Sequence, residues 1–491
     1  MSTTTTAVTV QEDSPSIPLE TLGQESILRG RPAATTTTFT NDDNEPAPSP
    51  QEETPGPRLD HSTLLKLLSA GISFFVAGVN DGSLGALIPH LIRSYDITTA
   101  VVSSLYGATL AGWLLAAVTA THLAQRLRLG SMLALGALLQ TAAHALRAWP
   151  VPPFGLYVST FLLTSLGQAY QDTYGNTFVA SLFEGDGKVD GKVDGQGDGQ
   201  GRGNGKKKSA HRWLGFIHAM YMAGCLVAPF GAASIAATAG EPGEGSRWWL
   251  FYTVPLGLGV MNLALVLVAF RDMLGFAGAN KRGQEGNAQE EEGRKSASRL
   301  IRDTLRKRSV WLLSIFFFFY LGVVVTAGGW VVEYLVDVRN GDIAQMGYVP
   351  AGFSGGCLLG RILLPEPTHR FGEKKMVALY CVLCLGFQLL FWLVPNIIAA
   401  SVAISLLGFF SGPLFATAVS VGTQLFPAEI SATAISFVFV FAQMGGSLFP
   451  VVTGVLGAKA GVSVMQPILV GLIAAMTISW LLVPQPKGKM K

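Results

Sequence analysis

Long apolar runs recur through this chain at short intervals, and this pattern excludes most soluble folds. A membrane-crossing helix needs about 20 mostly apolar residues. Of all residues, 49% are hydrophobic and only 14% are charged, whereas a soluble domain carries about 25% charged residues. The runs predict spans at about 64–90, 101–121, 131–148, 154–183, 213–238, 248–270, 310–334, 346–364, 375–394, 397–425, 431–457 and 464–483. We therefore expect an all-α membrane protein with twelve transmembrane helices.

Polar segments divide the chain into parts. The charged stretch 271–309 separates the sixth predicted span from the seventh and is expected to be a cytoplasmic linker. It leaves an N-terminal six-helix bundle at 61–270 and a C-terminal one at 310–484. Within the first bundle, residues 184–212 are a low-complexity insert rich in Gly, Asp and Lys, a composition typical of a flexible segment.

Lys and Arg are distributed unevenly between the two sides of the predicted spans. With the N-terminus inside, they concentrate in the inner connections and in the tail 485–491. The outer connections hold Arg93, Arg147, Arg247, Arg339 and Lys459. This bias predicts that both termini are cytoplasmic, the first as a disordered tail over 1–60 because that segment is rich in Thr, Ser, Pro and Glu. Plasma membrane and vacuolar membrane both remain open.

Two matching helix motifs indicate that the halves are repeats of one unit. The fifth span contains Gly224-x-x-x-x-Pro229, and the eleventh contains Gly445-x-x-x-x-Pro450. Gly permits close helix contact and Pro weakens the local helix. Their corresponding positions predict two pseudo-symmetric six-helix bundles, an arrangement found in many secondary transporters.

The loops after spans two and eight carry a recognisable motif. In 124–130, Arg126 fits the pattern G-x-x-x-D-[RK]-x-G-[RK], but Gln125 stands at its Asp position. A clearer copy is Gly360-Arg361 followed by 369–374. With the twelve spans and the central loop, these motifs resemble the major facilitator superfamily. The resemblance implies a conformational latch at the cytoplasmic helix ends, with candidates Arg126, Arg361, Arg370 and Glu373. The alternative is that Arg126, Arg128, Arg370 and Lys374 only anchor the topology.

Finer matches resemble one part of that superfamily. The stretch 80–89 in span one, with Tyr320, Gly322 and 328–330 in span seven, is similar to the fungal "bypass of stop codon" permeases and to the fucose and glucose/galactose permease branch. Val324 stands where that branch usually has an acid. The resemblance implies proton-coupled uptake of a sugar-like solute.

Polar side chains interrupt the fourth span. An ionised carboxylate there costs at least ~2.5–3.5 kcal/mol, so Asp172 should face a wet cavity or the bundle interior. The resemblance implies that spans one, four, seven and ten line the central path, and the predicted substrate contacts are Asn80, Gln168, Gln171, Asn176, Tyr320, Trp330 and, in span eleven, Gln443. The predicted proton-coupling residues are Asp172 and His218 and, as the resemblance to the fucose permease implies, Asp81. Asp172 as a structural clamp, Trp330 as ordinary packing and His218 as a structural histidine remain alternatives.

These features predict a secondary active transporter that moves a small polar, sugar-like solute by alternating access, with proton symport. The expected partners are the solute, protons and the lipid bilayer, without nucleic acid, and the expected state is a monomer. An HExxH site and an ATP-binding GxxxxGK[ST] loop are absent from the sequence, so we expect neither an enzyme nor a cofactor or metal. The alternatives are an exporter of amphipathic compounds or drugs, and a non-transporting membrane receptor with the same fold.

Overall fold

The computed structural model describes residues 60–184, 199–238, 246–276 and 299–485. All of these belong to the unit Leu59–Lys491, which is the only unit described below. The two predicted tails lie almost entirely outside the described residues, as do most of the linker and part of the insert. Helix α6 begins at Gly199, so the chain is helical before the apolar part of the fifth span starts.

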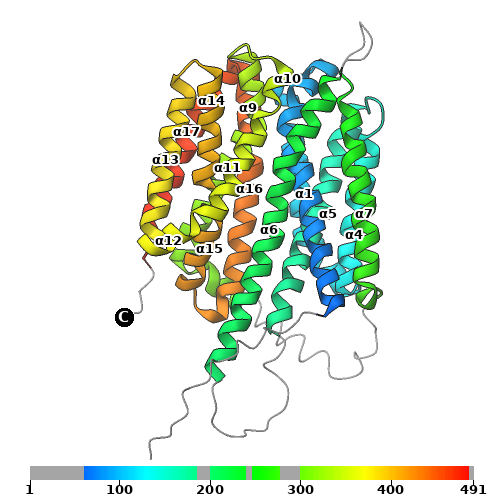
Figure 1. Ribbon diagram of the computed structural model, residues 1–491, viewed down its shortest axis with the longest axis vertical. Coiled ribbons are helices and arrows are strands. Elements are labelled where there is room, and N and C mark those ends of the chain that lie inside the picture. The colour runs from blue at the N-terminus through cyan, green and yellow to red at the C-terminus, as the bar shows by residue number, and fades with distance from the viewer. Residues whose placement is uncertain (1–59, 185–198, 239–245, 277–298, 486–491) are drawn as a thin grey trace, which may run out of the picture. The chain divides into compact units, whose positions relative to one another are not determined.

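The first half of the chain forms the six predicted helices (Figure 1). They are α1 (His61–Tyr95), α2 with α3 (Thr99–Val102 and Ser104–Ala124), α4 (Leu129–Arg147), α5 (Phe154–Glu184), α6 (Gly199–Ala237) and η1 with α7 (Trp248–Tyr252 and Thr253–Ala269), after which comes the short η2 (Arg271–Met273). We call the face at which α1 begins the inner face, and the face at which it ends the outer face.

The second half repeats this arrangement. It consists of α9 (Arg308–Asp337), α10 with α11 (Ile343–Met346 and Val349–Leu363), α12 (Pro365–Phe371), α13 (Glu373–Leu393), α14 with α15 (Ile397–Ser411 and Leu414–Leu425), α16 (Ala428–Ala460) and η3 with α17 (Val462–Val464 and Met465–Leu482). α12 is a short addition after the eighth span, and the tenth span is broken around Gly412 and Pro413.

Ten helices in the described part of the chain are long and apolar enough to cross a membrane. The other two predicted spans are also helical. α5 has 31 residues, and its polar side chains lower its hydropathy. α11 has 15 residues and is extended at its inner end by α12. The predicted helical membrane architecture is confirmed.

The Gly and Pro motifs lie at equivalent helix contacts in the two bundles. A Cβ on Gly224 of α6 would collide with the carbonyl oxygen of Phe75 in α1. A Cβ on Gly445 of α16 would collide in the same way with Phe318 in α9. Both glycines therefore let two helix backbones touch, and both motifs hold their Pro inside the helix. The motif that is repeated in the sequence thus corresponds to the same helix–helix contact in both bundles.

The two bundles touch through a set of small residues near the outer face. A Cβ on Gly85 of α1 would collide with the carbonyl oxygen of Gly328 in α9. The hydroxyl of Thr99 in α2 donates to the carbonyl oxygen of Gly454 in α16 at 2.9 Å. We call the contacts of Gly85, Thr99, Gly328 and Gly454 the outer seal, because they join the bundles on this side.

At the inner face, the segment after α7 is bound to the loop between α3 and α4. The amide of Arg128 donates to the carbonyl oxygen of Gly275 at 3.1 Å, and the Gly275 amide donates to the Ser131 hydroxyl at 2.8 Å. Leu127 and Phe276 form an isolated antiparallel bridge. We call these five residues the inner clasp. It holds the loop in which Gln125 replaces the motif Asp.

An ion pair lies next to the inner clasp. Lys66 of α1 donates to the Asp272 carboxylate at 2.6 Å. This hydrogen bond from Lys66 lowers the pKa of Asp272 below its ordinary value. Helix α1 is thereby tied to the same segment that the clasp ties to α4.

Candidate functional site

Asp81 is the centre of a hydrogen-bonded cluster halfway along α1. Its side chain is exposed, although the residue lies deep among helices, so it borders an accessible space. Oδ1 accepts a hydrogen bond from Asn80 Nδ2 at 2.9 Å. Oδ2 accepts one from Gln168 Nε2 of α5 and one from the Tyr221 hydroxyl of α6, each at 2.9 Å. Three donors stabilise the ionised carboxylate.

A buried arginine lies behind this cluster. Arg147, at the end of α4, is completely buried. It donates to Asn80 Oδ1 at 2.7 Å, and to the Thr160 and Thr164 hydroxyls of α5 at 2.6 and 2.8 Å. Its guanidinium carbon lies 3.8 Å from the centre of the Phe161 ring, as in a cation–π contact. Arg147 therefore fixes the Asn80 amide, which in turn donates to Asp81.

The assignment of Arg147 to an outer connection is wrong, because its side chain folds back into the bundle. A signal was present in the sequence. Gln140, His144 and Arg147 are spaced i, i+4, i+7 and share one face of α4, and all three are buried. A polar stripe on an otherwise apolar helix indicates an inward-facing side.

Asp172 lies one helical turn after Gln168 on the same side of α5. It is half-buried, and its charge and that of Asp81 act on each other. Among the described residues, its carboxylate accepts no hydrogen bond. Asn176 donates to the backbone carbonyl oxygen of Asp172 at 2.9 Å, so its amide is bound to its own helix.

The other glutamine of this helix points elsewhere. Gln171 is buried and accepts a hydrogen bond from Gln140 of α4 at 2.7 Å. It also accepts one from Asn262 of α7 at 3.5 Å. The structure therefore brings Gln168 to Asp81, while Gln171 joins three helices of the N-terminal bundle to one another.

The predicted aromatic contacts of span seven are buried in the C-terminal half. The Tyr320 hydroxyl donates to the Ser411 carbonyl oxygen at 3.3 Å, and Trp330 Nε1 donates to the Pro450 carbonyl oxygen at 3.1 Å. The Trp330 ring lies beside Tyr106 of the other bundle, near the outer seal. Trp330 thus packs at the boundary between bundles. Gln443 of α16 is half-buried.

His218 of α6 faces the C-terminal bundle. Its ring makes an edge contact with Phe74, with ring centres 5.4 Å apart. On its other side, the ring centre of Phe415 of α15 lies at 6.2 Å. His218 is therefore at the bundle boundary, one turn before Tyr221 and Met222 on α6.

The four predicted latch residues have different environments. Arg126 is exposed. Arg370 pairs with Glu366 within α12 at 2.7 Å. Glu373 accepts hydrogen bonds from Ser420 and Gln424 of α15 at 3.0 and 3.1 Å, which ties α13 to α15.

Arg361, the fourth, does not point to the inner surface. Its Nε donates to the Gly412 carbonyl oxygen at 3.2 Å, at the break in span ten. Its guanidinium carbon lies 5.8 Å from the ring centre of Phe415, and the Tyr320 hydroxyl lies beside it.

Two further chemistries find no support in the described residues. Gly352 to Gly356 match the letters of a G-x-S-x-G nucleophile elbow, but they lie inside α11 and not on a strand-to-helix turn. Among the described residues, no group of three or more His, Cys, Asp or Glu could hold a metal ion. All four cysteines are buried and unpaired.

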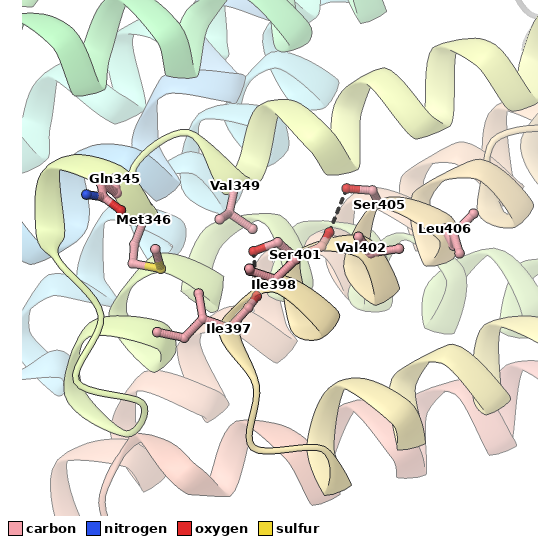
Figure 2. A pocket seen from close by; sticks show the side chains of 9 residues that line it. All are labelled: Gln345, Met346, Val349, Ile397, Ile398, Ser401, Val402, Ser405 and Leu406. Atoms are coloured by element: carbon pink, nitrogen blue, oxygen red, sulfur yellow. Dashed lines mark hydrogen bonds between the residues drawn. The ribbon is translucent and has the colours of Figure 1, made fainter.

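A surface cavity of about 530 Å³ lies between α14 and the outer end of α11 (Figure 2). It is lined by Gln345, Met346, Val349, Ile397, Ile398, Ser401, Val402, Ser405 and Leu406. Ser401 and Ser405 both bond to carbonyl oxygens of their own helix. The Asp81 cluster is not part of this cavity, and the candidate site rests on that cluster instead.

The sequence profile of the Major Facilitator Superfamily matches residues 70–450 and 339–491, and the chain belongs to this family. It is 27% identical over 449 residues to the "Bypass of stop codon protein 6" of Saccharomyces cerevisiae, covering 86% of this chain and 82% of the yeast protein. The predicted family and the predicted similarity to these fungal proteins are thus confirmed, and with them a multi-pass membrane protein of transporter type.

Solved structures share the fold. A D-xylose–proton symporter superposes with a TM-score of 0.63 at 13% identity, over 88% of this chain and all (100%) of the symporter. A bacterial homologue of the human lysosomal transporter Spinster gives 0.61 at 13% identity, over 87% and 95% of the two chains. FucP in its outward conformation gives 0.57 at 18% identity, over 86% and 100%.

Proposed function

We propose that this protein is a proton-coupled symporter of a small polar, sugar-like solute, which it moves by alternating access. The observation that carries the proposal is the Asp81 cluster. It places an accessible carboxylate at mid-membrane depth, together with amide and hydroxyl donors from α5 and α6. Such donors are the groups that bind sugar hydroxyls. The D-xylose–proton symporter, which shares the fold, carries a solute of this class.

In the proposed mechanism, solute binding and proton binding are coupled because the solute competes with Asp81 Oδ2 for the same hydrogen-bond donors. Gln168 and Tyr221 stabilise the ionised carboxylate while the site is empty. A solute hydroxyl that takes over either donor removes part of this stabilisation, and proton binding at Asp81 becomes more favourable. Solute and proton then favour each other's binding, as linkage requires. Asp172, one turn away, is the second candidate acid.

The basic residues favour an orientation with the inner face in the cytoplasm. In that orientation the outer seal lies at the extracytoplasmic end, and the bundles would have to separate there to admit a solute from that side. The seal contacts of Gly85, Thr99, Gly328 and Gly454 involve small residues, and the Trp330 and Tyr106 rings beside them would have to part as well.

The test is uptake into proteoliposomes under an imposed pH gradient, with neutral sugars, polyols and their acids as solutes. We expect accumulation by the native protein that collapses when the gradient is dissipated. Asp81→Asn and Asp172→Asn should retain exchange of solute across the membrane and lose accumulation. Accumulation with unchanged pH dependence in Asp172→Asn would exclude that residue as a coupling acid. Uptake of no polar solute, with export of hydrophobic dyes, would contradict the proposal.

A further inference from the structure

One cation in the C-terminal bundle lies close to mid-membrane depth. Arg361 bonds to the carbonyl oxygen of Gly412, where the 29-residue span of α14 and α15 is interrupted near its middle. It is half-buried. Its guanidinium carbon lies 5.8 Å from the ring centre of Phe415, which in turn lies 6.2 Å from that of His218 in α6 of the other bundle. The guanidinium therefore lies at the boundary between the bundles, where a solute must pass.

Part of the hydrogen-bonding capacity of this arginine is unused. Its Nε is bound to Gly412, and of the four further N–H donors on its two Nη atoms, one side of the fork faces the Tyr320 hydroxyl. Within the described ranges, no salt bridge involves Arg361, although surface pairs such as Arg370 with Glu366 are present. A cation without a counter-ion is costly at this depth and is characteristic of a functional site.

The immediate surroundings favour an anion. The Phe415 ring lies near the guanidinium group, and the Tyr320 hydroxyl lies next to it. Helix α15 starts at Leu414, adjacent to Phe415, and the N-terminal end of a helix carries partial positive charge. The two acidic residues of the candidate site, Asp81 and Asp172, belong to the N-terminal bundle and not to that of Arg361.

We propose that Arg361 binds an anionic group of the transported solute, so that the substrate class is a small polyhydroxy acid. This inference rests on the proposed function. The carboxylate of the solute would take the two Nη donors of Arg361 in a bidentate pair, a geometry that arginine favours. Its hydroxyls would meet Gln168 and Tyr221 on the other side. Because the solute brings one negative charge and Asp81 takes up one proton, the loaded site gains no net charge.

The experiment compares matched neutral and acidic solutes on the full-length protein. Binding of gluconate and of sorbitol is measured by titration calorimetry in detergent, and uptake of both is measured in proteoliposomes under a pH gradient. We expect gluconate to bind more tightly than sorbitol. Arg361→Gln should weaken gluconate binding roughly 10- to 100-fold, as expected for a lost hydrogen bond to a charged group. It should weaken sorbitol binding far less, because only a neutral hydroxyl would be left without the guanidinium.

Two further variants keep the comparison interpretable. Arg361→Lys retains the charge without the planar fork and should recover part of the preference for gluconate. Arg339→Gln is the matched control. Arg339 bonds to the Phe391 and Trp392 carbonyl oxygens at the end of α13, away from the bundle boundary, and its loss should not alter the preference.

The outcomes separate this inference from the proposed function. Sorbitol uptake driven by the pH gradient, with no gluconate binding, would overturn the inference and leave the symport proposal intact. Gluconate binding that depends on Arg361, with no gradient-driven uptake, would support the anion site and contradict symport. If the defect of Arg361→Gln is repaired by adding Asp172→Asn, Arg361 pairs with that acid during transport, and the solute-anion proposal is wrong.

Discussion

At the scale of single residues, the side chain that does most to define the site is one that cannot touch the solute. Arg147 is completely buried and reaches Asp81 only through Asn80. Asn80 Nδ2 is a donor, so Asp81 Oδ1 must remain an acceptor. The Tyr221 hydroxyl can turn to accept a hydrogen bond, so we expect the proton on Oδ2 once the solute has taken over the Gln168 donor. Arg147 is a positioning residue for the proposed coupling step.

The hydrogen bonds that lead from Arg147 through Asn80 to Asp81 form a relay. Removing either of its first two members should change the pH dependence of uptake more than the maximal rate of uptake. In Asn80→Leu the fixed donor to Oδ1 is lost, and in Arg147→Gln the nearby positive charge is lost. Both changes favour the proton-bound carboxyl, so we expect the pH of half-maximal uptake to rise by about one unit. Arg339→Gln is the control for removal of a charge. An unchanged midpoint in a well-folded Asn80→Leu protein would mean that the relay is only structural.

The two glutamines of α5 offer a second comparison. Gln168→Leu removes a donor to Asp81 and should raise the KM for the solute, with little effect on stability. Gln171→Leu removes the link between Gln140 and Asn262 and leaves buried polar groups without partners. It should lower the free energy of unfolding by about 1–3 kcal/mol and leave KM unchanged. Thermal unfolding in detergent and initial uptake rates distinguish the two; a reversed pattern would place Gln171 in the site.

The sequence predicted Asp81 and Gln168 as site residues, and the structure brings them together. Gln168 was predicted from the polar interruption of span four, and Asp81 from the resemblance to the fucose permease branch. The roles of Gln171 and Arg361 were not predictable in the same way. A side chain on a membrane helix can face its own bundle, the other bundle or lipid, and the choice depends on how neighbouring helices pack.

At the scale of elements, backbone contacts through glycine position the helices that carry the site. Gly78 and Gly224 let α1 touch α6, and α1 and α6 supply Asp81 and Tyr221. The sequence predicted this packing through the repeated Gly and Pro motifs. The break at Gly412 that receives Arg361 was not predicted, because the expected span ran through it without interruption.

Replacing one of these glycines should prevent the helices from packing. Gly445→Val would place side-chain atoms against the Phe318 backbone, where even a Cβ collides. We expect loss of folded protein, or a fall in the melting temperature, in size-exclusion and thermal-unfolding measurements. Gly386→Ala in α13 is the control, since a Cβ there meets nothing within 4 Å. It should be neutral or stabilising by about 0.5–1 kcal/mol. Equal effects of both would rule out close packing as the cause.

The ion pair near the inner clasp should make stability depend on pH. The pKa of Asp272 is lowered by Lys66 in the folded protein, so the unfolded state binds more protons at acidic pH. The stabilisation is complete above the ordinary value of 3.8 and disappears as the pH falls through the lowered pKa. Asp272→Asn should thus melt below the native protein at neutral pH, and the difference should vanish under strong acid. A difference that persists there would contradict the ion-pair explanation.

At the scale of the whole transmembrane unit, the outer seal joins the two bundles near the outer face. A Cβ on Gly457 of α16 would lie 4.0 Å from the Cβ of Thr99 in α2. This separation suits a disulfide. The bundles can therefore be linked covalently without moving their backbones.

Such a link should stop transport reversibly. We expect Thr99→Cys with Gly457→Cys to lose uptake on oxidation and to regain it with a thiol reductant. The control is Thr141→Cys with Gly259→Cys, whose Cβ atoms would be 3.5 Å apart within the N-terminal bundle. Its oxidation should leave uptake intact. Full activity of the oxidised Thr99 and Gly457 variant would mean that the bundles do not separate at this seal.

The charged side chains assigned to the solute path are divided by sign between the two halves of this protein. In the proposed mechanism Asp81 and Asp172 belong to one half, and Arg361 belongs to the other. A proton bound at Asp81 without the acid would leave Arg361 without a counter-ion, so reorientation of this half-loaded carrier should cost electrostatic work. Proton leak through a carrier that lacks its solute should therefore be slow.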